Sequence, residues 1–236
     1  MIQVFSDSKE LARGAAEYFV ARSEEAVAQK SFFTVALSGG STPKALYQLL
    51  ADAHEPFHAQ VPWSRTHFFW SDERHVPPDH PDSNYRMTHE AMLADVPVPE
   101  SNVHRVYSEN PNADEAAREY EQTLLQLTKQ TLPQLDLILL GLGPDGHTAS
   151  IFPGSEVLHE TERLVAAPWV EKFNTHRITM TLPLLNNGAT VLFLVSGAEK
   201  AEIVKAVLNG PKEFPAQFVQ PTHGQLLWLL DKDAAG

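Results

Sequence analysis

Cysteine is absent from all 236 residues of the chain. The protein therefore has no disulfide, no thiolate metal ligand and no cysteine nucleophile, so any nucleophile must be oxygen or nitrogen. Apolar runs of membrane-spanning length are also absent, because the longest ones are of strand length. The segment Met1 to Asp7 lacks the charged start and the long apolar region of a signal peptide. We therefore expect a cytoplasmic protein with no membrane partner.

Basic residues are scarce: 18 Lys and Arg stand against 30 Asp and Glu, which gives a formal net charge of −12. Surfaces that bind nucleic acid or anionic membranes need clustered Lys and Arg to displace counterions. The composition therefore predicts no nucleic-acid partner, and any anionic ligand must be held by a local site. The candidates for such a site are the few cations beside glycine turns, namely Arg74, Arg177 and Lys200.

Several catalytic motifs are missing or defective. There is no G-x-x-x-x-G-K-[ST] phosphate loop and no G-x-S-x-G elbow. His54 to His58 matches H-E-x-x-H, but Pro56 would break the helix that such a zinc site needs. Gly141 to Gly146 matches G-x-G-x-x-G, yet Asp145 would place negative charge beside a pyrophosphate. We expect neither a metal nor a dinucleotide cofactor.

What the chain does have is a regular alternation of helix-like and strand-like segments, and 43% hydrophobic residues. This alternation predicts an α/β fold with a mostly parallel sheet and helices on both faces, in one domain over residues 1–236. A long polar loop is expected over residues 71–83. The predicted helices cover 7–29, 42–50, 85–93, 113–130 and 198–208, and the predicted strands cover 32–37, 66–70, 135–140, 190–195 and 226–230. Residues 163–167 and 177–181 are also expected to be extended.

A glycine turn follows the first long predicted strand. Ser38-Gly39-Gly40-Ser41 precedes Thr42 and Pro43, which are typical of a helix N-cap and first helical residue. Free N–H groups, small residues and the positive end of a helix dipole would suit a phosphate. An ordinary tight turn with a capped helix explains the same residues, so the turn alone does not decide.

A second glycine turn carries ionisable side chains. Asp145 and His147 lie just past the apolar run Leu135 to Leu140, so they are expected at the carboxyl end of a parallel strand, facing a cleft. Small neighbours leave the His147 imidazole room to act as a catalytic base. Asp145 could orient the ring, raise its basicity or only cap the turn.

Charged residues at two further places complete the candidate set. Ser71-Asp72-Glu73-Arg74 follows a predicted strand and would lie at the carboxyl edge of the sheet. Arg177 opens an extended segment, and Lys200 opens a helix after Ser196 and Gly197. Each is singly compatible with a solvated surface residue, so only their combination indicates a site.

The motifs taken together resemble the 6-phosphogluconolactonase family of the glucosamine-6-phosphate isomerase/6-phosphogluconolactonase superfamily. The resemblance runs from about Leu37 to Leu208, and the Asp-Glu-Arg and Gly-Asp-Gly-His blocks are specific in combination. The segments that carry it are Leu37–Pro43, Trp70–Arg74, Ser83–Met87, Gly141–Phe152 and Arg177–Asn186.

This resemblance implies a glucosamine-6-phosphate isomerase-like, modified Rossmann-like fold. It also implies hydrolysis of 6-phospho-D-glucono-1,5-lactone to 6-phospho-D-gluconate in the pentose phosphate pathway, without a cofactor. By position, His147 would be the base, with Asp145 beside it, and Arg74 would lie near the reacting end or the phosphate. The residues expected to bind the substrate or its phosphate are Ser38, Gly39, Gly40, Ser41, Asp72, Arg177 and Lys200.

Two alternative functions remain open. A sugar-phosphate isomerase or deaminase of the same fold has a Glu five residues beyond its histidine, where this chain has Phe152, and an aromatic residue where it has Arg74. A non-catalytic sugar-phosphate sensor would bind the ligand unchanged, but the chain offers no basic helix for a DNA-binding head. The oligomeric state does not follow from the sequence.

Overall fold

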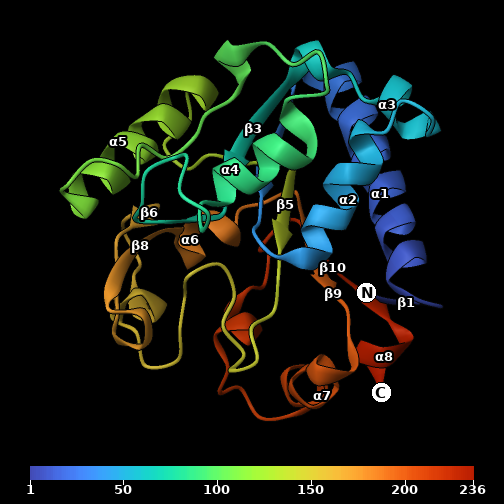
Figure 1. The fold of residues 1–236 in the computed structure, drawn as a ribbon. Coiled ribbons are helices and arrows are strands. Elements are labelled where there is room, and N and C mark those ends of the chain that lie inside the picture. The colour runs from blue at the N-terminus through green and yellow to red at the C-terminus, as the bar shows by residue number, and fades with distance from the viewer.

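A six-stranded, all-parallel sheet forms the centre of the computed structural model, which describes residues 1–236 (Figure 1). Its strand order is β1-β10-β9-β5-β2-β3. The predicted parallel sheet is thus confirmed, although β1 was not expected. The strands are β1 Ile2–Phe5, β2 Phe33–Leu37, β3 Thr66–Trp70, β5 Leu137–Leu140, β9 Thr190–Val195 and β10 Gln225–Asp231.

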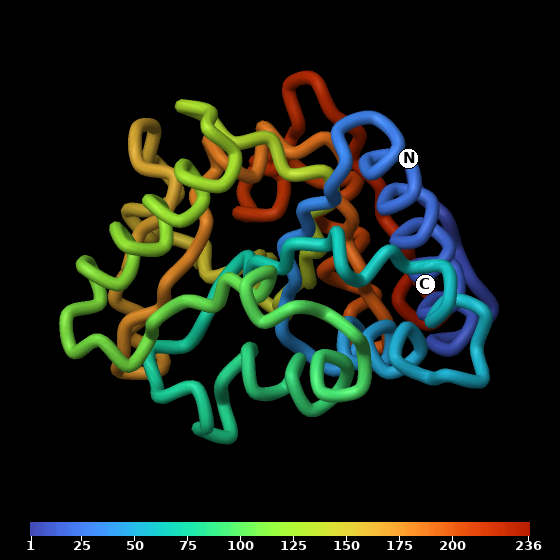
Figure 2. The backbone as a smooth tube through the Cα atoms, turned by 90° about the horizontal axis from the view of Figure 1, so that it is seen from above, coloured from blue at the N-terminus to red at the C-terminus, as the bar shows by residue number.

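Helices cover both faces of this sheet, as predicted. Successive residues of a strand point to opposite faces, and accordingly Phe193 packs in one apolar cluster with α5 and α7, while Leu192 and Leu194 pack in the other with α1 and α2. Figure 2 shows α1 and α5 on opposite sides of the strands. The helices are α1 Ser8–Lys30, α2 Ser41–Ala51, α3 Pro56–Gln60, α4 Asn84–Thr88, α5 Ala113–Thr128, α6 Leu182–Leu185, α7 Ala201–Asn209 and α8 Lys232–Ala235.

A second, antiparallel sheet lies at the carboxyl edge of the first; it was not predicted as a sheet, although the extended segments expected at 163–167 and 177–181 contain β6 and most of β8. Its strands are β4 Asp72–Arg74, β6 Val165–Ala166, β7 Trp169–Val170 and β8 Thr175–Met180, with β8 pairing the other three. Ser71 joins the two sheets: its N–H donates to the Leu37 carbonyl at 2.7 Å, and its own carbonyl accepts from the Met180 N–H at 2.8 Å. The predicted loop 71–83 therefore begins as a strand.

Several predicted element ends differ from those in the structure. Asp7 is the N-cap of α1, as expected, and accepts from two backbone N–H groups. Thr42 is not an N-cap, because α2 begins at Ser41 and its N-cap is Gly40, whose φ of 109° places it in the region that favours glycine. The helix expected from residue 198 begins with a 3₁₀ turn, Ala198–Lys200, before α7. None of the helices has the length and apolar character needed to cross a bilayer.

Candidate active site

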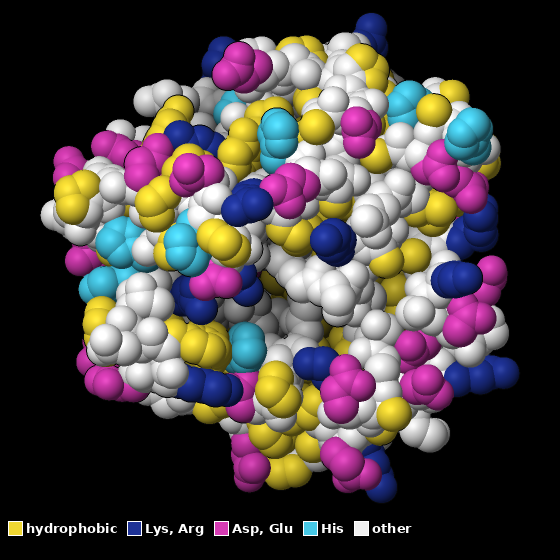
Figure 3. Space-filling view, in the orientation of Figure 1, with side chains coloured by type: hydrophobic (Ala, Val, Ile, Leu, Met, Phe, Trp, Pro, Cys, Tyr) yellow, Lys and Arg dark blue, Asp and Glu magenta, His cyan; other side chains and the backbone are white.

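A cavity of about 310 Å³ opens where the strand ends of the large sheet meet the small one. In Figure 3 it is the hollow near the middle of the face, with Lys or Arg and a His side chain at its rim. It brings together most of the predicted site residues, but Ser41 and Asp145 are not in its lining. Those that line it are Ser38, Gly39, Gly40, Asp72, Arg74, His147, Arg177 and Lys200.

The turn after β5 holds His147 by backbone hydrogen bonds and contains two positions that require glycine. The Gly143 N–H donates to the His147 carbonyl at 2.8 Å, and the Gly146 N–H donates to the Gly143 carbonyl at 3.0 Å. A Cβ on Gly143 would lie 2.0 Å from His147 Nδ1, so a side chain there would displace the imidazole. Gly146 has φ 76°, which also favours glycine. The imidazole is thus held against bare backbone.

Asp145 lies behind His147 rather than facing the cavity, which corrects the expectation that both would face it. Its Oδ1 bonds His147 Nδ1 and also accepts from the His147 backbone N–H at 3.3 Å. Partial burial raises the pKa of Asp145, but the hydrogen bond and charge of His147 outweigh it, so the pKa lies below its usual value. A charged Asp145 fixes the proton on Nδ1, which leaves Nε2 of the neutral ring free to accept a proton.

The turn after β2 supplies an unpartnered hydroxyl and a helix N-terminus. Ser38 is 3% exposed, and its Oγ is buried without a hydrogen-bond partner, although its backbone N–H and carbonyl both bond the Tyr47 hydroxyl. A buried hydroxyl in a cavity wall is expected to find a partner, here a bound ligand or water. Gly40 leads into the 11-residue helix α2, whose dipole favours an anion at this end.

Two arginines lie directly opposite each other on the small sheet. Arg74 of β4 pairs in register with Arg177 of β8, and like charges at such positions repel. Burial and the nearby Arg74 charge lower the pKa of Arg177. Neither arginine forms an ion pair with an acidic side chain. Arg74 Nη1 donates to the Asp82 carbonyl, and Lys200 donates to the Leu142 carbonyl at 2.9 Å. This unneutralised positive charge suits a bound anion.

Asp72, the first residue of β4, forms hydrogen bonds with two polar residues that were not predicted as site residues. Its Oδ2 accepts from Ser150 Oγ at 2.7 Å, and the Asn84 amide donates to its carbonyl at 2.9 Å. Asn84 also packs so closely on Gly39 that a Cβ there would lie 2.0 Å from Asn84 Oδ1. Asn84 and Ser150 lie in two of the segments that carry the family resemblance, Ser83–Met87 and Gly141–Phe152, but neither was predicted as a site residue.

Glu73 is buried beside this site and holds β4 to α4. Its carboxylate accepts from the backbone N–H groups of Arg74, Asn84 and Tyr85 at 2.7 to 2.8 Å, and from Ser83 Oγ at 3.1 Å. Burial raises the pKa of Glu73, and the three N–H groups oppose that shift. This carboxylate therefore anchors the start of α4 and is not offered to the cavity.

Two aromatic side chains that were not predicted as site residues also line the cavity, Phe152 and Phe173. No group of three or more His, Asp or Glu side chains is arranged to hold a metal ion. The ionisable groups of the cavity wall are therefore of two kinds: His147, which is paired with Asp145, and the cations Arg74, Arg177 and Lys200, which have no acidic partner.

Comparison with known proteins gives a consistent family. Residues 6–228 match the family model described as glucosamine-6-phosphate isomerases/6-phosphogluconolactonase. The 6-phosphogluconolactonase of Synechocystis sp. is 42% identical over 90% of this chain and 88% of the relative. The 6-phosphogluconolactonase of Nostoc sp. is 39% identical over 99% of this chain and 96% of the relative.

Solved structures agree with the sequence comparison. The 6-phosphogluconolactonase from Trypanosoma brucei superposes with a TM-score of 0.87 at 32% identity, covering 100% of this chain and 97% of that one. A monomeric glucosamine-6-phosphate deaminase superposes with a TM-score of 0.83 at 22% identity, over 99% and 98%, which shows a shared fold.

Proposed function

The chain belongs to the glucosamine-6-phosphate isomerase/6-phosphogluconolactonase family, and we propose that His147 is the general base with which it hydrolyses 6-phospho-D-glucono-1,5-lactone to 6-phospho-D-gluconate in the pentose phosphate pathway. The observation that carries this assignment is the Asp145–His147 pair, which leaves Nε2 free in a cavity that also holds two unpaired arginines. The ligand class is a phosphosugar lactone, and residues 1–236 act as one domain.

The chemistry follows from the free nitrogen. A lactone is an activated ester, so a water molecule whose proton is taken by His147 Nε2 can attack the carbonyl carbon without a covalent intermediate. As the water's O–H proton moves to Nε2, the carbonyl becomes a tetrahedral oxyanion. The C–O bond to the ring oxygen then breaks, and His147 returns its proton to that oxygen. Arg74 and the N–H groups of the glycine turns are the donors available to the oxyanion.

The phosphate supplies binding energy away from the reacting carbon. Arg177, Lys200 and the turn at Ser38 to Gly40 hold it, since these carry unneutralised charge, an unpartnered hydroxyl and a helix N-terminus. Asp72 would repel a phosphate, so we assign its carboxylate to the hydroxyl groups of the sugar. Fixing the phosphate orients the carbonyl against the water and lowers the entropic cost of the attack.

An isomerase or deaminase reaction is less well supported at this site. Such a reaction needs a further acid near the histidine, but the cavity wall beside His147 is Phe152. Efficient conversion of glucosamine 6-phosphate to fructose 6-phosphate and ammonia would revive this alternative. We further propose a cytoplasmic location with no nucleic-acid or membrane partner, although several rice and Arabidopsis relatives are named as chloroplastic.

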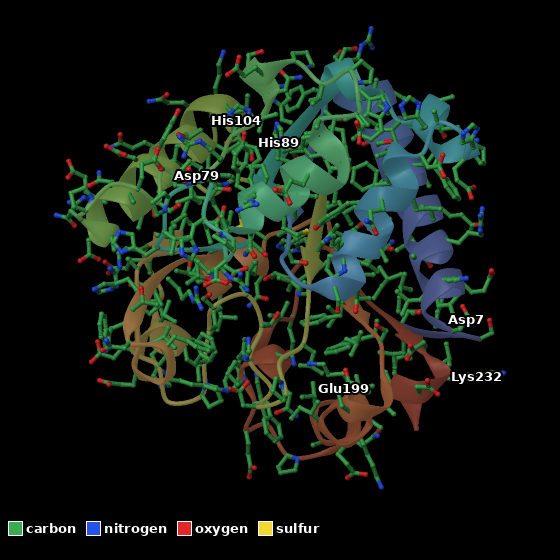
Figure 4. The ribbon with its side chains drawn as sticks, in the orientation of Figure 1. Asp7, Asp79, His89, His104, Glu199 and Lys232 are labelled. Atoms are coloured by element: carbon green, nitrogen blue, oxygen red, sulfur yellow. The ribbon has the colours of Figure 1, made fainter.

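The direct test measures lactone opening at near-neutral pH, after subtraction of the spontaneous rate, for the wild type and for folded His147→Ala. We expect kcat to fall about 10²- to 10⁴-fold, the usual contribution of a general acid–base group. The matched control is His89→Ala, because His89 is exposed outside the cavity (Figure 4) and should retain full activity. Full activity in His147→Ala would keep the reaction and discard this base.

A further inference from the structure

A continuous row of stacked groups joins the histidine to one of the arginines. The Phe152 ring lies on the His147 ring, with centroids 4.2 Å apart and an angle of 29°. Phe173 meets Phe152 edge to face, with centroids 6.0 Å apart. The Arg177 guanidinium carbon lies 4.9 Å from the centre of the Phe173 ring. The row therefore runs His147, Phe152, Phe173, Arg177 along the cavity.

The row connects the two sheets of the molecule. Phe152 follows the turn after β5 of the large sheet, whereas Phe173 ends the 3₁₀ turn Glu171–Phe173 between β7 and β8 of the small one. Next to it, Lys172 Nζ lies 3.8 Å from Asp145 Oδ2, so the same turn also approaches the partner of the histidine. The aromatic contact is thus a link between base and arginine, beside the hydrogen bonds of Ser150 to Asp72 and Thr179.

Phe152 completes the support of the imidazole without occupying its reactive atom. Asp145 bonds Nδ1, Gly143 lies where a Cβ would clash with Nδ1 and Cε1, and Phe152 covers one ring face. A hydrogen-bonding residue at the position of Phe152 could compete for Nε2, while an aromatic face cannot. Ring stacking therefore restricts the imidazole and leaves Nε2 free.

Phe173 has the equivalent effect on Arg177. A carboxylate partner would fix the guanidinium, but it would also neutralise the charge and occupy the N–H donors that an anion needs. An aromatic face attracts the cation and leaves the donors in the guanidinium plane free. Arg177 forms no ion pair and faces Arg74, and the Phe173 ring is a direct contact of its guanidinium.

We propose that Phe152 and Phe173 are positioning residues for the lactonase reaction, Phe152 for the His147 base and Phe173 for the phosphate-binding Arg177. The inference rests on the roles proposed above for these two partners. A purely structural role does not explain Phe173, because its side chain is 46% exposed and an exposed aromatic ring adds little to a core.

The experiment separates the two residues by kinetics. Phe152→Leu should lower kcat about 5- to 20-fold with KM within about twofold, because it loosens a group that acts mainly in the transition state. Phe173→Leu should raise KM for the phosphorylated lactone about 3- to 10-fold with kcat little changed, because it loosens a binding cation. The aromatic variants Phe152→Tyr and Phe173→Tyr should recover most of each loss.

Trp169→Leu is the matched control, since Trp169 is also 46% exposed and belongs to the neighbouring strand β7 but does not line the cavity. It should leave both constants unchanged. Calorimetric binding of 6-phosphogluconate to the two Leu variants gives a readout without catalysis: Phe173→Leu should weaken it as KM rises, and Phe152→Leu should not.

Three results would overturn the inference: both variants behaving like Trp169→Leu, both changing kcat and KM together with a fall in thermal stability, or no recovery by tyrosine. Failure of the proposed function is seen separately, as full activity in His147→Ala measured alongside. In that case a normal binding loss in Phe173→Leu would still support the role of Phe173 at Arg177.

Discussion

The two sheets contribute differently to the same cavity. The large parallel sheet delivers glycine turns from its carboxyl ends, and with them His147 and the Ser38 hydroxyl. The small antiparallel sheet delivers Arg74 and Arg177, which face each other without acidic partners. On the large sheet the ionisable group is fixed by a dedicated partner, Asp145, and on the small sheet the ionisable groups are left unpaired. A paired group suits proton transfer, and unpaired cations suit an anion.

After His147 itself, the residue whose substitution should lower kcat most is its partner, Asp145. Asp145→Asn should lower kcat about 10²-fold with little change in KM, because a neutral amide is a weaker acceptor for the Nδ1 proton and its N–H group can instead donate to Nδ1. Steady-state kinetics on a variant whose circular dichroism matches the wild type would check this. A change confined to KM would place Asp145 with the binding residues and weaken the contrast between the sheets.

On the small sheet, Arg177→Ala should raise KM about 10-fold and lower kcat less, because it removes uniform binding of the phosphate. On the large sheet, Lys200→Ala should act in the same direction more weakly, since Lys200 follows β9 and already donates to the Leu142 carbonyl. Lys30→Ala is a control in which the cation is paired, with Asp136 at 2.9 Å. Unchanged KM in both Arg177→Ala and Lys200→Ala would remove these residues from the site.

The attachment of the small sheet can be tested through Glu73. Glu73→Gln should destabilise the protein by about 2 kcal/mol. In the wild type both carboxylate oxygens accept from backbone N–H groups, and in the variant an amide N–H group would replace one of these acceptors and face a donor. Denaturant unfolding measures this, with Glu90→Gln as the control, since Glu90 is exposed and pairs only with Arg86. If the two variants were equally stable, Glu73 would not be an anchor.

A smaller effect is a pH dependence of stability caused by His104, which lies beside β3 of the large sheet and outside the cavity. Burial, with a lesser contribution from His67, lowers the pKa of His104 to about 4. Between the ordinary histidine value of about 6.5 and this folded value, the unfolded chain binds more protons, so stability falls as the pH falls through that window. After allowance for solvent screening, we expect the free energy of unfolding to fall by about 1 to 2 kcal/mol over this pH window.

His104→Phe should remove this acid sensitivity and preserve the stacking on Phe69, whose ring centroid lies 4.7 Å away. Unfolding measured at pH 7 and pH 4.5 gives the comparison. An equal loss of stability in the wild type and the variant would assign the acid sensitivity to other groups.

Most of the large sheet could be predicted from sequence because its strands are largely apolar runs, three of which, β2, β5 and β9, lead into glycine turns. His147, Asp145 and the Ser38 turn were found for that reason. Strand β1 was missed because its four residues lie at an edge and are only half-buried. Of the small sheet, the segments of β6 and β8 were expected to be extended, but their pairing was not predicted. β4 was missed because it consists entirely of charged residues, a composition typical of loops.

The side chains found only in the structure share one property, which is that their role depends on tertiary contacts. Phe152 and Phe173 are 21 positions apart in the sequence and meet only because the β7–β8 turn folds over the turn after β5. Asn84 reaches Asp72 from a different element altogether. Sequence patterns predict elements and their ends, whereas such contacts follow from how those ends are brought together.

The central claim is that His147 of the large sheet carries the proton transfer and that Arg177 of the small sheet is a principal contact of the phosphate. The most direct measurement compares kcat/KM for 6-phosphogluconolactone and for unphosphorylated glucono-1,5-lactone in the wild type, His147→Gln and Arg177→Gln. We predict that His147→Gln lowers both values by the same factor and that Arg177→Gln removes most of the preference for the phosphorylated substrate. An unchanged preference in Arg177→Gln, or its loss in His147→Gln, would contradict the account.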